Sequence, residues 1–165
     1  MQENKWASSV ILVDADYIDS VAFDLIVNFE RMLGRRIPQA DLCHWLDCIA
    51  LDGGLRPEKN DIQVHFLHNK ETEKLKNFQP SILKEDINGL TFDDNLGHFE
   101  LFSFPVEELV SKDEFFLQSF TMLADAKEIK NLMVIGDVQT YGTQLKQICT
   151  QTDGKDITLF AMEPM

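Results

Sequence analysis

Short apolar segments that alternate with helical patterns constrain the fold of this chain more than any other feature of its sequence. Five such segments, rich in β-branched and other apolar residues, occur at 9–13, 62–67, 99–104, 132–135 and 157–161. Continuous apolar runs of this length are typical of strands that are covered on both faces, as in a parallel sheet. Segments 62–67 and 99–104 also carry polar residues, which favours positions nearer the edges of the sheet.

The intervals between these segments show the apolar periodicity of amphipathic helices. The four predicted helices are 18–33, about 38–52, about 113–127 and a fourth around 141–149. Gly34 is suited to end the first helix, because glycine readily adopts the left-handed conformation found after helix ends. The sequence Ser111-Lys-Asp-Glu114 fits a capping box that would open the third helix.

This order of elements predicts an α/β protein. We expect a three-layer α/β/α sandwich with a mostly parallel central sheet of about five strands. Apolar residues make up 44% of the 165 residues, which is enough for one packed domain over 1–165. The polar segment 70–97 is read as an insertion or lid, in which 89–92 could pair as a hairpin with the strand that follows His98.

The charge of the chain narrows the kinds of partner that it can bind. It carries 15 Lys and Arg against 28 Asp and Glu, a net charge of −13. Affinity for nucleic-acid phosphates comes largely from cationic contacts, so this charge argues against a surface that coats a polyanion. A metal site remains compatible with it, since carboxylates are the ligands that hard divalent cations prefer.

The number of cysteines and the first residues of the chain indicate the cellular compartment in which the protein is expected. Three cysteines form no even disulfide framework, which indicates a reducing environment. The first residues are polar and unlike a signal peptide, and no apolar run approaches the roughly 20 residues that span a bilayer. We therefore expect a soluble, cytoplasmic protein without a membrane partner.

Aspartates follow two of the predicted strands. Asp14 and Asp16 come after the first strand, and Asp137 comes after Gly136 at the end of the fourth. Ligands of open α/β sheets bind beyond the carboxyl ends of the strands. If the two strands are neighbours, Asp14 and Asp137 converge there, and a bound cation would relieve their repulsion. Asp113, at the start of the third helix, could supply a further ligand from the same edge.

Helix capping is a second explanation for the same residues. Asp is a favoured N-cap, and Asp16 stands two residues before the first periodic helix. Asp113 lies inside the capping-box pattern, where the helix dipole alone favours an acid. Asp137 stands directly ahead of the fourth helix and could cap it.

Other reactive side chains give weaker signals. Cys43, His44 and Cys48 share one helix, but their spacing is not that of zinc ligands, and buried thiols explain them better. His65 and His68 lie on or just after the second strand and would point to opposite faces, where a structural role is the simpler reading. A local basic patch for phosphate could form, although solvated surface is the usual outcome, from Arg35, Arg36, Lys70, Lys74 and Lys76.

The two aspartate-bearing stretches resemble the NYN branch of the PIN-like nuclease superfamily. The first is Val10-Ile-Leu-Val-Asp14-Ala-Asp16-Tyr17-Ile18 running into a long helix, and the second is Leu132-Met-Val-Ile-Gly-Asp137-Val-Gln139. Lys112-Asp113 stands where the family often begins a helix with an acid, and Asp156-Ile-Thr-Leu-Phe160 matches its last strand.

This resemblance implies a divalent-metal-dependent ribonuclease with RNA as its partner. Mg²⁺ or Mn²⁺ would be held by Asp14, Asp16 and Asp137, and the metal would activate water for cleavage of a phosphodiester. Asp14 and Asp137 would then be catalytic, with Asp113 as an outer ligand or base.

Some positions depart from the family pattern. Tyr17 stands where the first motif commonly has Asn, and Gln139 stands where the late motif commonly has a second acid. The acid expected midway along the third helix is replaced in a region that contains Gln118 and Phe120. The resemblance therefore implies a depleted acidic site. A non-catalytic binding or regulatory module on the same fold, acting with a protein partner or as a homodimer, is the alternative.

A third possibility comes from another class of enzyme. Asp14-Ala-Asp16 also looks like the first motif of haloacid-dehalogenase-like phosphatases, with Asp14 as nucleophile and Asp16 as general acid and base. Gly136-Asp137 would then lie in the metal-binding motif. That family usually continues with Gly-Thr where Tyr17-Ile18 stands here.

Overall fold

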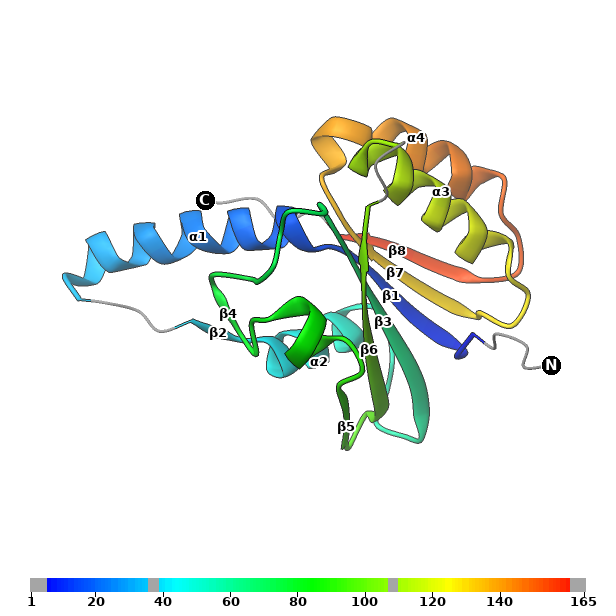
Figure 1. Ribbon diagram of the computed structural model, residues 1–165. Helices are drawn as coiled ribbons and strands as arrows, with labels where there is room; N and C mark the ends of the chain where they lie inside the picture. The colour runs from blue at the N-terminus through cyan, green and yellow to red at the C-terminus, as the bar shows by residue number, and fades with distance from the viewer. Residues whose placement is uncertain (1–5, 36–38, 107–109, 161–165) are drawn as a thin grey trace.

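A computed structural model of the chain describes residues 6–35, 39–106 and 110–160. Its centre is a six-stranded sheet in the order β5-β6-β3-β1-β7-β8 (Figure 1). The strands are β1 (Ser9–Asp14), β3 (Asn60–His68), β5 (Thr91–Asp94), β6 (Gly97–Pro105), β7 (Asn131–Ile135) and β8 (Asp156–Phe160). All neighbours pair in parallel except β5 and β6, which are antiparallel. The predicted α/β class with a mostly parallel sheet is confirmed.

The sheet has six strands where about five were expected. The additional strand is β5, because the predicted hairpin forms and adds its first strand to the edge of the main sheet. Segments 62–67 and 99–104 belong to β3 and β6, which each have a neighbour on both sides, with β6 next to the edge strand β5. Residue 161 of the fifth predicted strand lies outside the described residues.

Within the described residues, four α-helices connect these strands: α1 (Ala15–Leu33), α2 (Leu42–Asp52), α3 (Lys112–Asp125) and α4 (Val138–Thr150). Gly34 ends α1 with φ 66°, as predicted. Ser111 caps α3 by accepting a hydrogen bond from the Glu114 amide at 3.1 Å. The second helix was expected to begin near Pro38, which lies outside the described residues. It begins at Leu42, where Asp41 caps it through the His44 amide.

Apolar side chains cover both faces of the sheet. Ile11 and Val13 of β1 belong to a cluster with residues of α1 and α2, whereas Val10 and Leu12 belong to a cluster with α3 and α4. This alternation follows from the two-residue period of a strand. Full burial of each such side chain stabilises the fold by about 1.5–3 kcal/mol.

The segment 70–97 is part of this core. It contains β4 (Phe78–Gln79), which pairs with β2 (Ala40–Asp41), and a short π-helix η1 (Leu83–Ile87). Its buried apolar side chains belong to the same cluster as residues of α1 and α2, and they are Leu75, Phe78, Leu83, Ile87 and Leu96. The segment therefore packs against the sheet domain, with polar residues between its apolar anchors.

The predicted apolar stripe of α1 is buried over only part of its length. Ile18, Val21 and Ala22 are buried, but Met32 is 77% exposed and Leu33 is 53% exposed. Figure 1 shows the reason, since the second half of α1 extends beyond the edge of the sheet. The side chains at 25, 26 and 29 lie outside the described part. No helix of the described ranges is long and apolar enough to cross a membrane.

Candidate functional site

Asp14 and Asp137 reach the same edge of the sheet, as the sequence predicts for neighbouring strands. Asp14 is the last residue of β1, which pairs in parallel with β7, and Asp137 follows β7 by two residues. Tyr141 of α4 connects them. Its hydroxyl donates to Asp14 Oδ2 at 3.0 Å and accepts from the Asp137 amide at 3.0 Å.

Asp14 lies at the centre of the site and is only 1% exposed. Its Oδ1 accepts from the Tyr17 amide at 3.1 Å, so Asp14 is the N-cap of α1. The Nζ of Lys112, at the start of α3, lies 3.1 Å from the same oxygen. Burial raises the pKa of Asp14, and the positive charge of Lys112 opposes that rise. The buried aspartate thus has a cation of the chain itself beside it.

The Tyr141 hydroxyl acts as a neutral hydrogen-bond donor. Burial raises the pKa of Tyr141 well above its usual value, and the nearby charge of Asp14 raises it further. The ring of Tyr141 stacks on Phe116 of α3, with ring centroids 5.0 Å apart. This packing fixes the direction in which the hydroxyl points. The hydroxyl can therefore bond to Asp14 at the end of β1 and to the Asp137 amide after β7 at the same time.

Asp137 caps a helix as well. Its carboxylate accepts from the Thr140 hydroxyl at 2.7 Å and from the Thr140 amide at 3.3 Å, at the start of α4. The capping explanation therefore describes Asp14 and Asp137. For Asp16 the structure gives a different role, because Asp14 is the cap of α1 and Asp16 lies in its first turn.

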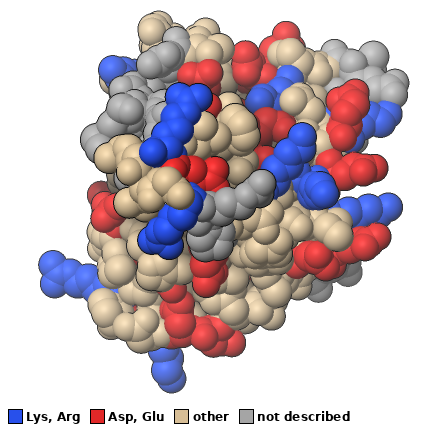
Figure 2. Space-filling model, turned by 90° about the vertical axis from the view of Figure 1, so that its left-hand side faces the viewer, with Lys and Arg blue, Asp and Glu red and all other residues tan. Residues whose placement is uncertain are grey.

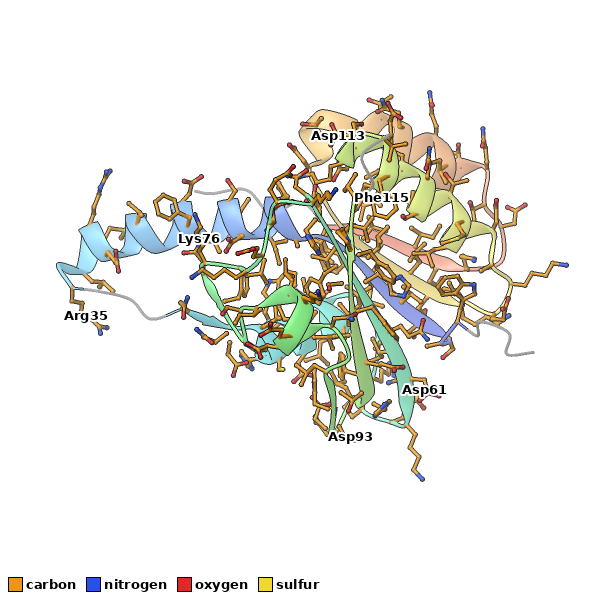
Figure 3. The ribbon with its side chains drawn as sticks, viewed as in Figure 1. Arg35, Asp61, Lys76, Asp93, Asp113 and Phe115 are labelled. Carbon is orange, nitrogen blue, oxygen red and sulfur yellow. The ribbon has the colours of Figure 1, made fainter. Side chains whose placement is uncertain are left out.

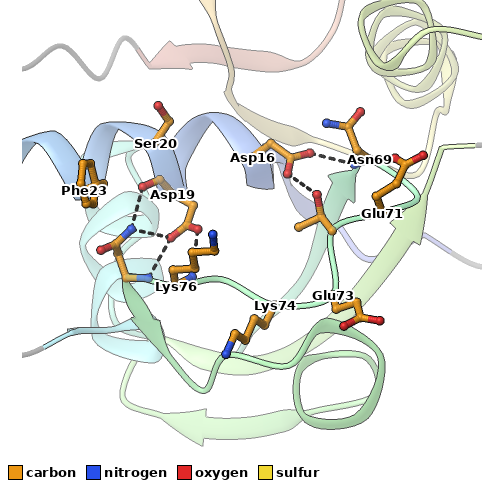
Figure 4. A pocket seen from close by; sticks show the side chains of 11 residues that line it. Asp16, Asp19, Ser20, Phe23, Asn69, Glu71, Glu73, Lys74 and Lys76 are labelled. Atoms are coloured by element: carbon orange, nitrogen blue, oxygen red, sulfur yellow. Dashed lines mark hydrogen bonds between the residues drawn. The ribbon is translucent and has the colours of Figure 1, made fainter.

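Asp16 binds the loop that follows β3. Its carboxylate accepts from the Asn69 amide at 2.7 Å and from the Thr72 hydroxyl at 2.6 Å, and Lys112 Nζ lies 3.9 Å away. One turn along α1, Asp19 accepts from the amides of Lys76 and Asn77, each at 2.9 Å. Figure 4 shows these bonds along a cavity of about 710 Å³. Two carboxylates of α1 thus hold the loop 69–77 in place.

Asp113 lies at this edge of the sheet, outside the hydrogen bonds and the ion pair described above for Asp14. It is in the first turn of α3, and its charge adds to the rise in the pKa of Tyr141. Figure 3 shows it at the opposite end of the sheet from Asp61 and Asp93. Within the described residues, no group of three or more His, Cys, Asp or Glu side chains is arranged to hold a metal ion.

Comparison with known proteins places the chain in a family. A model described as "Family of unknown function (DUF6621)" matches residues 3–165. The chain belongs to the DUF6621 family. No curated protein and no solved structure matches it.

Two residues of the site, Lys112 and Tyr141, were not identified as site residues from the sequence. Lys112 could have been noticed from its place in the first turn of a helix. The helix dipole disfavours a cation there, so a Lys at this position suggests a nearby acidic partner. The signal for Tyr141 is its place in an apolar helix stripe, since a buried tyrosine hydroxyl usually finds a hydrogen-bond partner. Neither signal names the partner.

The weaker candidates of the sequence are distributed over other parts of this DUF6621 member. His44 Nε2 lies 3.8 Å from Cys48 Sγ on α2. His65 is buried among aromatic rings, and desolvation lowers its pKa to about 4. On the face shown in Figure 2, basic and acidic side chains are interspersed, and neither sign forms a continuous field.

Proposed function

We propose that this DUF6621 member is a binding or regulatory module on a PIN/NYN-like, three-layer α/β/α fold. In this proposal the aspartates of a nuclease-type edge stabilise the structure and hold no catalytic metal. The observation that carries the proposal is the position of the Lys112 ammonium, 3.1 Å from Asp14 and 3.9 Å from Asp16.

The contacts of Asp14 support this reading. Its two carboxylate oxygens already accept from an amide, a hydroxyl and an ammonium. A divalent cation at Asp14 would have to displace Lys112, and two cations beside one buried carboxylate repel each other. Removing one partner from a buried ion pair typically costs about 3–5 kcal/mol. As arranged, these donors therefore do not fit Mg²⁺ or Mn²⁺.

The topology supports the fold part of the proposal. The five parallel strands run in the order β6-β3-β1-β7-β8, so β1 is central and the chain reverses its direction of winding there. Such a switch point is where open α/β sheets bind ligands. Apolar clusters on both faces of the sheet are compatible with a helical layer on each side.

A metal-dependent ribonuclease is the second candidate. It is favoured by the meeting of Asp14 and the Asp137 backbone at one hydroxyl, with Asp16 close to the same ammonium. The Lys112 side chain is 20% exposed, so it has a path away from Asp14. If it moved, Asp14 and Asp16 would be free to bind a cation that orients water towards an RNA phosphodiester.

Titration with Mg²⁺ and Mn²⁺ by calorimetry, combined with a single-stranded RNA cleavage assay, distinguishes the two candidates. We expect neither metal binding nor cleavage by the wild-type chain. Lys112→Met should unfold more easily by about 3–5 kcal/mol, because Asp14 is left unpaired. Lys146→Met, which removes an exposed charge from α4, is the matched control and should leave stability nearly unchanged.

Three results would contradict the proposal that the chain is a non-catalytic module. Metal-dependent RNA cleavage that is abolished in Asp14→Asn and in Asp137→Asn would establish the nuclease. Release of phosphate from monoesters, with a trapped aspartyl intermediate at Asp14, would establish the phosphatase. Metal binding by the wild-type chain that Asp14→Asn removes would show that Lys112 does not close the site.

A further inference from the structure

A second cavity lies beside the loop 69–77, at the carboxyl ends of β3 and β6. Its volume is about 730 Å³, which falls within the range of about 300–1,000 Å³ usual for small-molecule sites. His68 and Pro105, a parallel pair in the sheet, line it together with residues of the loop and of η1. We call it the lysine cavity, after Lys70, Lys74 and Lys84 in its lining.

The charge of the lysine cavity is opposite to that of the chain. Its lining contains three Lys against Glu73 and Glu85, whereas acids outnumber bases by 28 to 15 over the whole sequence. Lysine binds phosphate as a compact point charge with several donors. The lining also includes Ser103 and Asn88, which add polar groups next to the ammonium groups. This composition favours an anionic ligand.

His68 is an independent indication of a ligand. The residue is 5% exposed and lines the lysine cavity. Its Nδ1 lies 2.8 Å from the Asn69 carbonyl oxygen, which can only accept, so Nδ1 carries the proton. The buried Nε2 of the neutral ring is then an acceptor, and it has no hydrogen-bond partner within the described residues. Buried polar atoms are usually hydrogen-bonded, so a ligand that reached Nε2 would supply the missing partner.

A phosphate group is suited to this acceptor, because a P–OH can donate a hydrogen bond to Nε2. The second ionisation of a phosphate monoester lies at about pH 6, so a fraction of the monoester still carries its P–OH near neutral pH. Sulfate offers oxygen acceptors alone.

Apolar groups complete the lysine cavity. Ile82, Leu83 and Pro105 line it, and Ile82 is 37% exposed. A site with ammonium groups, one histidine and an apolar wall matches a ligand that has a phosphate at one end and an apolar or aromatic body at the other. We propose that the lysine cavity binds a small phosphomonoester of about the size of a mononucleotide, with its phosphate at His68 and the lysines. Because Nε2 is buried, ligand entry must expose it.

Calorimetry with AMP, adenosine, inorganic phosphate and sulfate tests this assignment. We expect AMP to bind more tightly than inorganic phosphate, and adenosine at least about tenfold more weakly than AMP. The double variant Lys74→Met/Lys84→Met should weaken AMP binding by about tenfold or more, because both lysines are exposed and their loss leaves the core intact. Lys127→Met/Lys146→Met, with the same change of charge at exposed positions outside the cavity, should bind AMP like the wild type.

The histidine is tested separately. His68→Asn keeps an N–H near the Asn69 carbonyl and removes Nε2. Phosphate should bind the wild type more tightly than sulfate does, and this preference should shrink in the variant. In the wild type, the ¹⁵N resonance of His68 Nε2 should shift when AMP is added.

Several results would overturn the assignment. They are failure of AMP and phosphate to bind at millimolar concentration, equal affinity for adenosine and AMP, or equal loss of affinity in the two double-lysine variants. A His68 resonance that AMP leaves unchanged would also overturn it. These measurements do not involve Lys112 or Asp14, so their outcome is distinct from that of the metal and RNA experiments.

Discussion

His65 should make the stability of this protein fall steeply in mild acid. The residue lies on β3, is 5% exposed and is surrounded by aromatic rings. Its ring centroid lies 5.6 Å from that of Trp6, 5.7 Å from Phe102 and 5.3 Å from Phe104. Desolvation in this cluster lowers the pKa of His65 from 6.5 to about 4. The folded protein therefore holds the ring neutral where an unfolded chain would protonate it.

The size of the effect follows from this difference in pKa. Each pKa unit corresponds to about 1.4 kcal/mol, so a shift from 6.5 to about 4 corresponds to roughly 3 kcal/mol. Because the pKa is lowered in the folded state, the contribution is fully present above pH 6.5, is lost as the pH falls from about 6.5 to about 4, and is gone below that. Between about pH 7.5 and about pH 5, linkage predicts a loss of about 2 kcal/mol from this residue.

Urea unfolding of the wild type and of His65→Phe at these two pH values measures the contribution. Phenylalanine fills the same aromatic cluster and does not titrate. The difference in unfolding free energy between the two proteins should therefore move by about 2 kcal/mol in favour of the variant on going to about pH 5. Phe92→Leu, a control in the separate ring pair with Phe99, should differ from the wild type by the same amount at both pH values. Parallel pH profiles for the wild type and His65→Phe would refute the reasoning.

Three further substitutions test local features of the fold. Asp47→Asn should stabilise the protein by about 1 kcal/mol at neutral pH after allowance for solvent screening, because burial and the neighbouring Asp94 raise the pKa of Asp47 to about 6. A raised pKa of an acid weakens the fold as the pH rises through that value, so the gain should vanish by about pH 4 in urea titrations. Gly97→Ala should cost more than about 2 kcal/mol, since Gly97 has φ 138° and a Cβ there would meet the Asn60 backbone. Gly154→Ala, at φ 81° with open space around it, should cost about 1–2 kcal/mol in thermal or urea unfolding.

The sequence predicted the interior of the fold better than its margins. Continuous apolar runs identified β1 and β7 because strands buried on both faces have few polar positions, and Gly34 marked the end of α1 through its φ of 66°. The spacing of apolar residues in a helix does not show whether its apolar face packs on the sheet or extends beyond it. For this reason the exposure of the last turn of α1 was not predicted. Periodicity also gave no sign that the few, widely spaced apolar residues of segment 70–97 are buried.

The aspartates show where the limit of sequence reasoning lies. A carboxylate between a strand and a helix reaches both the free amides of the helix and the open edge of the sheet, so capping and metal binding select the same residue at the same place. The two functions differ in whether a cationic side chain from another part of the chain already pairs with the carboxylate. Lys112 brings that charge from a helix far along the chain, which no local pattern around Asp14 or Asp137 contains. The number of acids at this edge therefore says less about its function than the position of one lysine, and the Lys112→Met variant tests that position directly.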